Sequence, residues 1–377
     1  MAVDFEAEGL LEGLEGEERE ARLELLTQLH DAGCSLEELK QAVEEDRLAL
    51  LPLEQAIGGD RSRYTEPELA ERAGVDLDFL RAHARALGFP QPDENERVFG
   101  DADARAAELI RRFRDGGLPE EGMLEISRVL GQSMARLAAA VGSVFGDAFI
   151  QPGDTERDVG LRYAEAAREL APQMTPLLEY VLQRHQLELI KQIVVDRAGL
   201  AEGRLPGGRE MTVCFADLVG FTRLGEDVSP AELGSVAGHL TELATDVATP
   251  PVRLVKMIGD AAMLVAPEPD PVLAAALELV EAADARGESF PQLRAGVACG
   301  EAIGRGGDWY GHPVNLASRI TAVAYPGSVL ATNEVREAAD GDYRWSEAGL
   351  KRFKGIEGRV GLNRVRRDGE AEDGSPD

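Results

Sequence analysis

Apolar residues recur every three or four positions through the first 200 residues, and short continuous apolar runs replace this pattern afterwards. The first spacing places apolar side chains on one face of a helix, whereas the second is typical of buried strands. Leu, Ala, Glu and Arg dominate the first part and β-branched clusters are rare there, which favours helix. We therefore expect an all-helical first half and a second half that contains a sheet.

Local signals predict where several helices begin and end. Ser35 followed by Glu38 reads as a capping box that starts a helix. A later apolar stripe predicts a helix that runs to about Leu200, where Gly203 and Pro206 end it. The residues of that stripe are Leu177, Leu178, Val181, Leu182, His185, Leu189 and Ile193. Residues 177–208 are thus predicted to be a connecting helix followed by a short linker.

Runs of strand length follow this linker, and helical segments near 230–247 and 270–285 separate them. Such alternation predicts a domain of mixed helices and strands. The polar residues 367–377 are expected to be disordered. The strand-length runs cover residues 211–216, 252–258, 262–266 and 293–299.

Composition narrows the choice of partners and compartment. The net charge of −29 and the pI near 4.6 repel nucleic acid and anionic membrane surfaces. An anionic substrate must therefore be held by local cations or metal ions. The three cysteines have no metal-ligand spacing and are expected to be small buried hydrophobes. The acidic N-terminus does not resemble a signal peptide, and no apolar run is long enough to be a transmembrane segment, so a cytoplasmic protein is expected.

Two aspartates in the second half are candidate metal ligands. Asp217 ends an apolar strand and precedes Gly220, in a place where backbone amides can face an anion. Asp260 follows Gly259 between two strand-length runs, which predicts a tight hairpin turn with the carboxylate at its tip. Hard divalent cations take oxygen ligands and complete their coordination with substrate phosphates. Either aspartate alone is more typical of an ordinary turn.

A helix with polar residues on one face is predicted shortly before residue 325. Asn315 and Arg319 are four residues apart in 313–322, whose apolar spacing suits a helix with Pro313 in its first turn. Both side chains therefore share a face and can reach one nucleotide together. Without further motifs, a solvated arginine on a helix face explains Arg319 equally well.

Three segments taken together resemble the class III nucleotidyl cyclases. They are 213–222 with the sequence VCFADLVGFT, 256–260 with KMIGD, and 308–319 with DWYGHPVNLASR. The resemblance extends over about residues 209–366 and implies an α+β fold, a ferredoxin-like βαββαβ catalytic domain behind the helical domain. It also implies that Asp217, Leu218 and Asp260 hold two Mg²⁺ or Mn²⁺ ions per active site.

The resemblance assigns the purine to Lys256 and Asp308. Adenine offers a ring acceptor and an exocyclic amino donor, so a lysine donor and an aspartate acceptor fit ATP, whereas guanine requires the opposite polarity. An adenylyl cyclase that makes 3′,5′-cyclic AMP and pyrophosphate is therefore expected, with a guanylyl cyclase as the alternative. The other roles that the resemblance implies are substrate binding by Phe221 and Thr222, ribose orientation by Asn315, α-phosphate contact by Arg319 and terminal phosphate contact by Lys354.

The sequence departs from the pattern of mammalian-type catalytic halves at one point. These halves carry an arginine in the strand before the purine-reading segment, where this chain has Cys299-Gly300-Glu301. In the family, Lys256 and Asp260 serve opposite sides of the substrate, so one chain cannot complete its own site. Since this chain contains both sets of residues, the resemblance implies a head-to-tail homodimer with two equivalent sites.

The first half offers two interpretations. Residues 64–126 resemble a degenerate helix-turn-helix of the mercury-resistance-regulator type, which keeps a nucleotide-sensing transcription regulator as an alternative. The acidic Asp76 and Asp78 at the predicted recognition helix count against nucleic acid binding. The order of elements instead resembles the mycobacterial pH-sensing adenylyl cyclases, in which an N-terminal helical domain restrains catalysis.

That resemblance implies a regulatory, autoinhibitory domain over residues 1–176, activation at mildly acidic pH, and a fatty acid or lipid among the helices. His185 and His312 are the candidate pH sensors, because histidine titrates near neutral pH. For each, an ordinary packed or solvated histidine is the more economical explanation.

Overall fold

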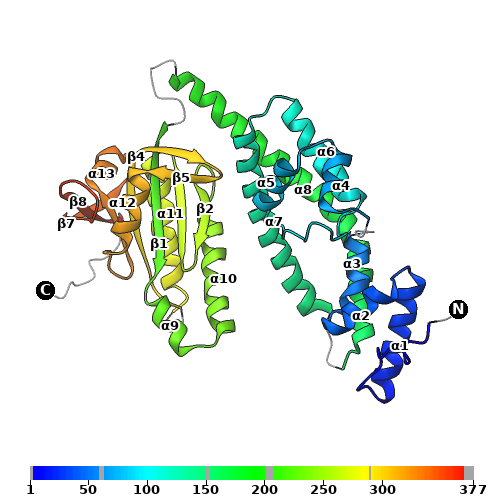
Figure 1. Ribbon diagram of the computed structural model, residues 1–377. Helices are drawn as coiled ribbons and strands as arrows, with labels where there is room; N and C mark the ends of the chain where they lie inside the picture. Colours follow the sequence, from blue (N-terminus) through cyan, green and yellow to red (C-terminus); the bar gives the residue numbers. More distant parts are fainter. Residues whose placement is uncertain (1–2, 59–62, 150–152, 201–207, 288–289, 369–377) are drawn as a thin grey trace. The chain divides into compact units, whose positions relative to one another are not determined.

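The structure, a computed structural model, describes residues 3–58, 63–149, 153–200, 208–287 and 290–368. It divides into two compact units, Met1–Val195 and Asp196–Asp377. Figure 1 shows helices in the first unit and a sheet covered by helices in the second. The predicted change from helix to mixed structure is confirmed.

The first unit is helical throughout its described residues, apart from an isolated β-bridge between Tyr64 and Phe99. Leu25, Leu26, Leu39 and Leu48 are fully buried and form the centre of a small core around the first helices. The helices are α1 (Gly16–Asp31), α2 (Leu36–Glu44), η1 (Leu48–Leu50), α3 (Leu51–Gly58), α4 (Glu66–Ala73), α5 (Leu77–Leu87), α6 (Asp101–Asp115), α7 (Glu120–Phe149) and α8 (Glu156–Leu200).

The predicted capping box at the start of α2 is present. The backbone amide of Ser35 donates to Glu38 Oε2 over 2.7 Å, and the Glu38 amide donates to Ser35 Oγ over 3.2 Å. Two amides at the start of the helix are thereby satisfied. The local sequence pattern was sufficient for this prediction because both partners lie within one turn.

Helices α4 and α5 form the pair predicted as a helix-turn-helix. Gly74 ends α4 with a φ of 69°, a left-handed conformation that glycine adopts without strain. Asp76 caps α5 by accepting the Phe79 amide over 2.8 Å. Asp76 therefore satisfies the start of the helix, which gives this acidic residue a structural explanation.

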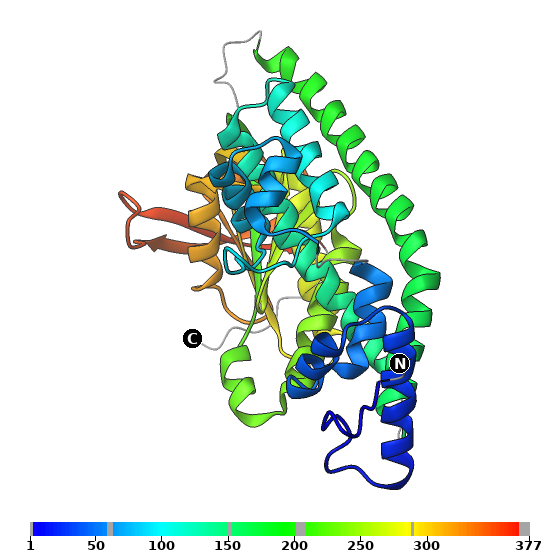
Figure 2. The same ribbon diagram turned by 45° about the vertical axis from the view of Figure 1, so that its right-hand side comes forward.

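Helix α8 is longer than the connecting helix that was predicted. It begins at Glu156 and continues through Pro172 and Pro176, as the unbroken green helix in Figure 2 shows. Each proline removes one backbone donor and strains the preceding turn, but the flanking residues are strong helix formers. The described stripe side chains are exposed, including Leu177 at 54% and Leu182 at 58%, while the side chain of Ile193 lies outside the described part. Over the described residues, none of the helices is both long and apolar enough to cross a bilayer.

The second unit contains a mixed sheet with the order β2-β3-β1-β4-β6-β8-β7, and β5 pairs with β4. The first four strands alternate with helices as βαββαβ, and their order is that of a ferredoxin-like sheet, so this prediction is confirmed. Figure 2 shows the β7–β8 hairpin in red at one edge. The strands are β1 (Gly208–Leu218), β2 (Arg253–Ile258), β3 (Ala261–Ala266), β4 (Leu293–Arg305), β5 (Asp308–Gly311), β6 (Ser328–Thr332), β7 (Tyr343–Lys351) and β8 (Val360–Arg367).

Alternation along β1 directs side chains to two separate cores. Cys214 and Ala216 pack with helices α10 and α11, whereas Val213 and Phe215 pack with α12 on the other face. Helices therefore cover both faces of the sheet, and β1 is held in the middle. The helices of this unit are α9 (Phe221–Asp227), α10 (Pro230–Val247), α11 (Pro269–Asp284), α12 (His312–Thr321) and α13 (Asn333–Ala338).

Three expectations near the ends of elements need comment. Arg367, predicted to begin the disordered tail, is paired in β8 because Tyr343 lies opposite it and Glu281 accepts its Nε over 2.8 Å. Residues 369–377 lie outside the described residues, as do linker residues 201–207. Lys354, expected on a strand, instead lies in the turn after β7.

Candidate active site

The end of β1 and the β2–β3 turn form one corner of the site. Asp217 lies opposite Ala261 in the β1–β3 pairing, and the Leu218 amide donates to the Asp260 carbonyl over 3.0 Å. Gly259 has a φ of 61°, which lets the chain turn immediately before Asp260. The two candidate carboxylates are therefore next to each other. The Leu218 side chain is only 1% exposed, so its backbone carbonyl is the group that could face a metal ion.

The environment of Asp217 opposes its negative charge. Burial raises the pKa of Asp217, the hydrogen bond from Arg294 lowers it, and the neighbouring Asp260 raises it again. Arg294 Nη2 lies 2.8 Å from Asp217 Oδ2. Two carboxylates that repel each other across a short gap form a site for a cation.

Arg294 was missed in the sequence. It begins β4 and lies directly opposite Asp217 in the antiparallel β1–β4 pairing. The run 293–299 is recognisable as a strand, but its partner strand is not. No local signal could therefore have connected these two residues.

The donor set suits a hard divalent cation that also binds the substrate. Over the residues that the structure describes, no group of three or more His, Cys, Asp or Glu side chains could hold a metal ion. Asp217 and Asp260 thus supply two carboxylates, a number typical of Mg²⁺ sites in which phosphate oxygens and water complete the coordination. The residues present fit such an ion.

Lys256 and Asp308 form an ion pair between β2 and β5. A β-bulge between Leu254 and Lys256 changes the direction of the strand at this point. Asp308 Oδ1 also accepts the Trp309 amide over 2.8 Å, and the Trp309 ring is buried in the core beneath α12. The predicted pair is therefore assembled within one chain, with its carboxylate held from two sides.

Helix α12 carries Asn315 and Arg319 and is fixed closely to the sheet. The hydroxyl of Thr321 donates to the Phe215 carbonyl over 3.0 Å, two residues before Asp217. A Cβ on Gly296 would lie only 2.4 Å from the Thr321 amide nitrogen, so the helix approaches β4 where a side chain is missing. Asn315 is exposed and Arg319 is partly buried.

The turn after β7 reaches this helix. A Cβ built on Gly355 would lie 3.7 Å from Arg319 Nη2, which places the turn beside the guanidinium. Lys354 precedes Gly355 and is exposed. Its placement in a turn corrects the strand that was expected, but the turn brings it to the helix that carries Arg319.

The start of α9 holds the remaining predicted residues. Gly220 has a φ of 74° and leads directly into Phe221. Phe221 packs against the core under α10 and α11, whereas Thr222 is exposed. If Phe221 contacts the substrate, its backbone amide is the available group.

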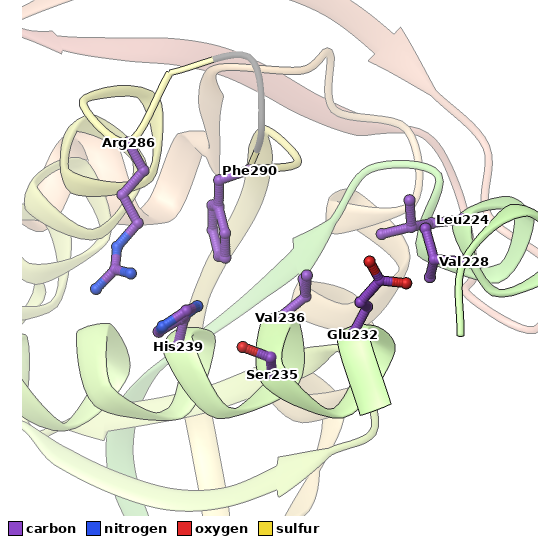
Figure 3. Close-up of a pocket in the computed structure, with 8 residues that line it drawn as sticks. All are labelled: Leu224, Val228, Glu232, Ser235, Val236, His239, Arg286 and Phe290. Atoms are coloured by element: carbon purple, nitrogen blue, oxygen red, sulfur yellow. The ribbon is translucent and has the colours of Figure 1, made fainter. Parts of the chain in front are cut away.

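A cleft of about 480 Å³ lies on another part of this unit (Figure 3). Figure 3 shows Arg286 and His239 on either side of Phe290, with Glu232 across the opening. The predicted site residues do not line it. Its lining residues are Leu224, Val228, Glu232, Ser235, Val236, His239, Arg286 and Phe290.

Comparison with known proteins identifies both halves of the chain. Residues 3–189 match the adenylate cyclase regulatory domain, and residues 206–362 match the adenylate and guanylate cyclase catalytic domain. The "pH-sensitive adenylate cyclase MT1302" of Mycobacterium tuberculosis is 40% identical over 97% of this chain and 93% of its own length. An adenylate cyclase of Streptomyces coelicolor is 34% identical over 78% of this chain and 76% of its own length. The chain therefore belongs to the adenylate cyclases that combine this regulatory domain with a class III catalytic domain.

Proposed function

We propose that this enzyme converts ATP to 3′,5′-cyclic AMP and pyrophosphate at sites shared by two copies of the chain. The observation that carries the choice of ATP is the Lys256–Asp308 ion pair. An ammonium donor beside a carboxylate acceptor matches N1 and the amino group of adenine. Guanine presents a donor and a carbonyl oxygen at the same edge and would meet like groups there.

Asp217, Asp260 and the Leu218 carbonyl would hold two divalent cations, Mg²⁺ or Mn²⁺. When bound, such ions lower the pKa of the ribose 3′-hydroxyl and neutralise charge on the triphosphate. The protein's part is to present two carboxylates side by side, and the Leu218–Asp260 backbone hydrogen bond fixes their separation.

Helix α12 and the adjoining turn would position the rest of the nucleotide. Asn315 orients the ribose, and Arg319 faces the α-phosphate, where negative charge builds on the equatorial oxygens during in-line attack. Lys354, in the turn beside Arg319, reaches the terminal phosphates. The Thr321 hydrogen bond and the close approach at Gly296 keep this helix in register with the metal corner.

Exposed apolar side chains support a homodimer. Ile258 next to the β2–β3 turn is 48% exposed, and Ile303 and Tyr310, opposite each other on β4 and β5, are 52% and 56% exposed. They accompany the predicted purine-reading strands. A second copy would cover these side chains and bring the metal corner of one protomer to the purine pair of the other.

The substrate is tested by assaying purified full-length protein with ATP and with GTP, each with Mg²⁺ and with Mn²⁺. We expect cyclic AMP as the main product under both metals. Equal or faster formation of cyclic GMP would establish the guanylyl cyclase alternative. No cyclic nucleotide from either substrate, combined with tight ATP binding, would support the nucleotide-sensing regulator.

Shared sites are tested by mixing two inactive proteins. Asp217→Ala removes a metal ligand and Arg319→Ala removes a phosphate contact, so a heterodimer of the two retains one intact site. We expect the mixture to regain up to a quarter to a half of wild-type activity, depending on subunit exchange. Verified heterodimers without activity would exclude the shared arrangement.

Acidic activation through the helical unit is the regulatory part of the proposal. His83 on α5 is 1% exposed, its Nδ1 lies 3.0 Å from Ser127 Oγ on α7, and its Nε2 has no described hydrogen-bond partner. The candidates from the sequence, His185 and His312, are both exposed. His83 was overlooked because its burial depends on the packing of α5 against α7.

The direction of the pH effect follows from burial. Burial lowers the pKa of His83, and the charge of Glu120 opposes this. Packing of α5 on α7 is therefore fully stable above the unfolded pKa of about 6.5 and loses stability as the pH falls through the lowered value. Acid would loosen the helical unit, which supports release of an inhibited state. The relative from Mycobacterium tuberculosis is named as pH-sensitive.

The lipid ligand stays outside this proposal. A cleft in the helical unit is lined by Arg63, Tyr64, Glu68, Glu71, Arg72 and Arg97. These are charged side chains apart from one tyrosine, whereas a fatty acyl chain requires an apolar lining. The cleft therefore gives no support for a bound lipid.

A further inference from the structure

Arg294 makes an asymmetric contact with the candidate metal ligand Asp217. Its Nε and Nη2 lie 3.2 and 2.8 Å from the same carboxylate oxygen, Oδ2. The guanidinium therefore does not occupy Oδ1. A carboxylate that is held through one oxygen keeps a fixed orientation and can still offer the other to a cation.

The same guanidinium has a second anchor on α12. Arg294 Nη1 donates to the Ala322 carbonyl over 3.2 Å, and Ala322 is the residue that caps the end of this helix. The last carbonyls of a helix carry partial negative charge and favour a cation. Arg294 thus joins Asp217 on β1 to the helix that carries Asn315 and Arg319.

We propose that Arg294 is a positioning residue for the metal corner, which holds Asp217 with Oδ1 open and fixes its place relative to α12. This inference rests on the metal role proposed above for Asp217. Arg294 touches neither substrate nor metal in this role and acts through the carboxylate that it orients.

A competing role predicts the opposite effect. If Arg294 merely neutralised Asp217 until a cation displaced it, removal of the guanidinium would strengthen cation binding. In the positioning role removal weakens binding, because a ligating carboxylate loses its support, and such losses typically amount to about 10- to 100-fold in affinity. The Arg294 and Asp217 side chains are 27% and 22% exposed, and an ion pair near the surface contributes little to folding. The protein should therefore remain folded without it.

The test measures Mn²⁺ binding to the full-length protein without nucleotide, using the electron paramagnetic resonance signal of free Mn²⁺. The variants are Arg294→Gln, Arg294→Lys and Asp217→Asn. Arg286→Gln is the matched control, because Arg286 is 35% exposed, pairs with Glu242 and lies away from the predicted site. Since the chain is strongly acidic, the binding that counts is the part that Asp217→Asn removes.

We expect Arg294→Gln to weaken this binding about 10-fold or more. Arg294→Lys should restore part of it because lysine keeps the charge but loses the two-point geometry, and Arg286→Gln should leave it unchanged. Unchanged or tighter binding in Arg294→Gln, with Asp217→Asn still removing it, would overturn the positioning role and leave the metal role intact. If Asp217→Asn binds Mn²⁺ like the wild type, the proposed metal role itself is wrong.

Thermal unfolding of the same proteins separates positioning from simple loss of structure. We expect Arg294→Gln to unfold within a few degrees of the wild type. If it unfolds much earlier, the comparison rests on Arg294→Lys. Wild-type affinity in a folded Arg294→Lys protein, with an unfolded Arg294→Gln, would assign Arg294 to stability alone and overturn the inference.

Discussion

The two units of the chain use their apolar residues differently. In the catalytic unit, apolar side chains fill cores on both faces of the sheet, and β1 contributes to both. In the helical unit, the core cluster described surrounds α1–α3, while Leu130 on α7 and Leu182 on α8 remain 48% and 58% exposed. A double-faced core holds site residues in one geometry, whereas an uncovered apolar face gains stability when another surface meets it.

Glycines at close backbone contacts sharpen this comparison. Gly296 lets α12 approach β4, and Gly131 lets α7 approach the end of α5, where a Cβ would lie 2.3 Å from the Leu87 carbonyl oxygen. The first contact positions Arg319, and the second lies in the helix pair that buries His83. The same local device thus serves catalysis in one unit and the proposed regulation in the other.

The largest expected effect separates catalysis from folding in the sheet unit. Arg319→Ala should lower kcat by about 100- to 1,000-fold, the range observed when one preorganised group is removed from a developing oxyanion. Cyclic AMP formation at saturating ATP measures this, and thermal unfolding should be nearly unchanged. A loss below 10-fold would remove Arg319 from the phosphate site.

A second change should break the catalytic unit through packing. Gly296→Ala introduces a Cβ against backbone atoms of α12, and overpacking of this kind typically costs about 1–3 kcal/mol. We expect a lower unfolding temperature together with reduced activity, since Arg319 moves with the helix. Gly304→Ala on the same strand is the control, because its Cβ would meet Trp309 at an ordinary 3.6 Å. Equal behaviour of the two variants would refute the close contact.

The equivalent change in the helical unit should alter control more than chemistry. Gly131→Ala places a Cβ against the Leu87 backbone and should loosen α5 from α7. We expect activity at neutral pH to rise several-fold toward the acidic level, with the maximal rate unchanged. Gly142→Ala on the same helix is the control, since a Cβ there meets nothing within 4 Å. If Gly131→Ala lowers activity at every pH, the helical unit supports catalysis and does not restrain it.

The smallest effect concerns pH. His83→Gln keeps a hydrogen-bonding group near Ser127 but cannot gain a proton, so the acidic increase in activity should flatten below about pH 6.5. His185→Gln on α8 removes an exposed histidine and should retain the wild-type profile. Activity profiles of full-length proteins between pH 5.5 and 8 provide the measurement. A response that is lost with His185 and kept without His83 would move the sensor to α8.

Sequence patterns were accurate where the relevant interactions are local. The capping box at Ser35, the hairpin turn at Asp260 and the helix that carries Asn315 and Arg319 depend on residues within one or two turns. The strand expected at Lys354 was wrong because β7 ends at Lys351 and the chain turns before β8 begins. The start of α8 was also missed, since two prolines suggested a boundary that the surrounding helix formers override.

The sequence by itself determined the order of helices and strands, the acidic character and the presence of every candidate catalytic group. Only the tertiary structure decided that Arg294 supports Asp217 across 77 residues, that Lys256 pairs with Asp308, and that His83 is buried. Periodicity and capping arise from neighbours along the chain. Strand pairing and helix packing instead join distant residues, and the energy of those contacts exists only once both partners are in place.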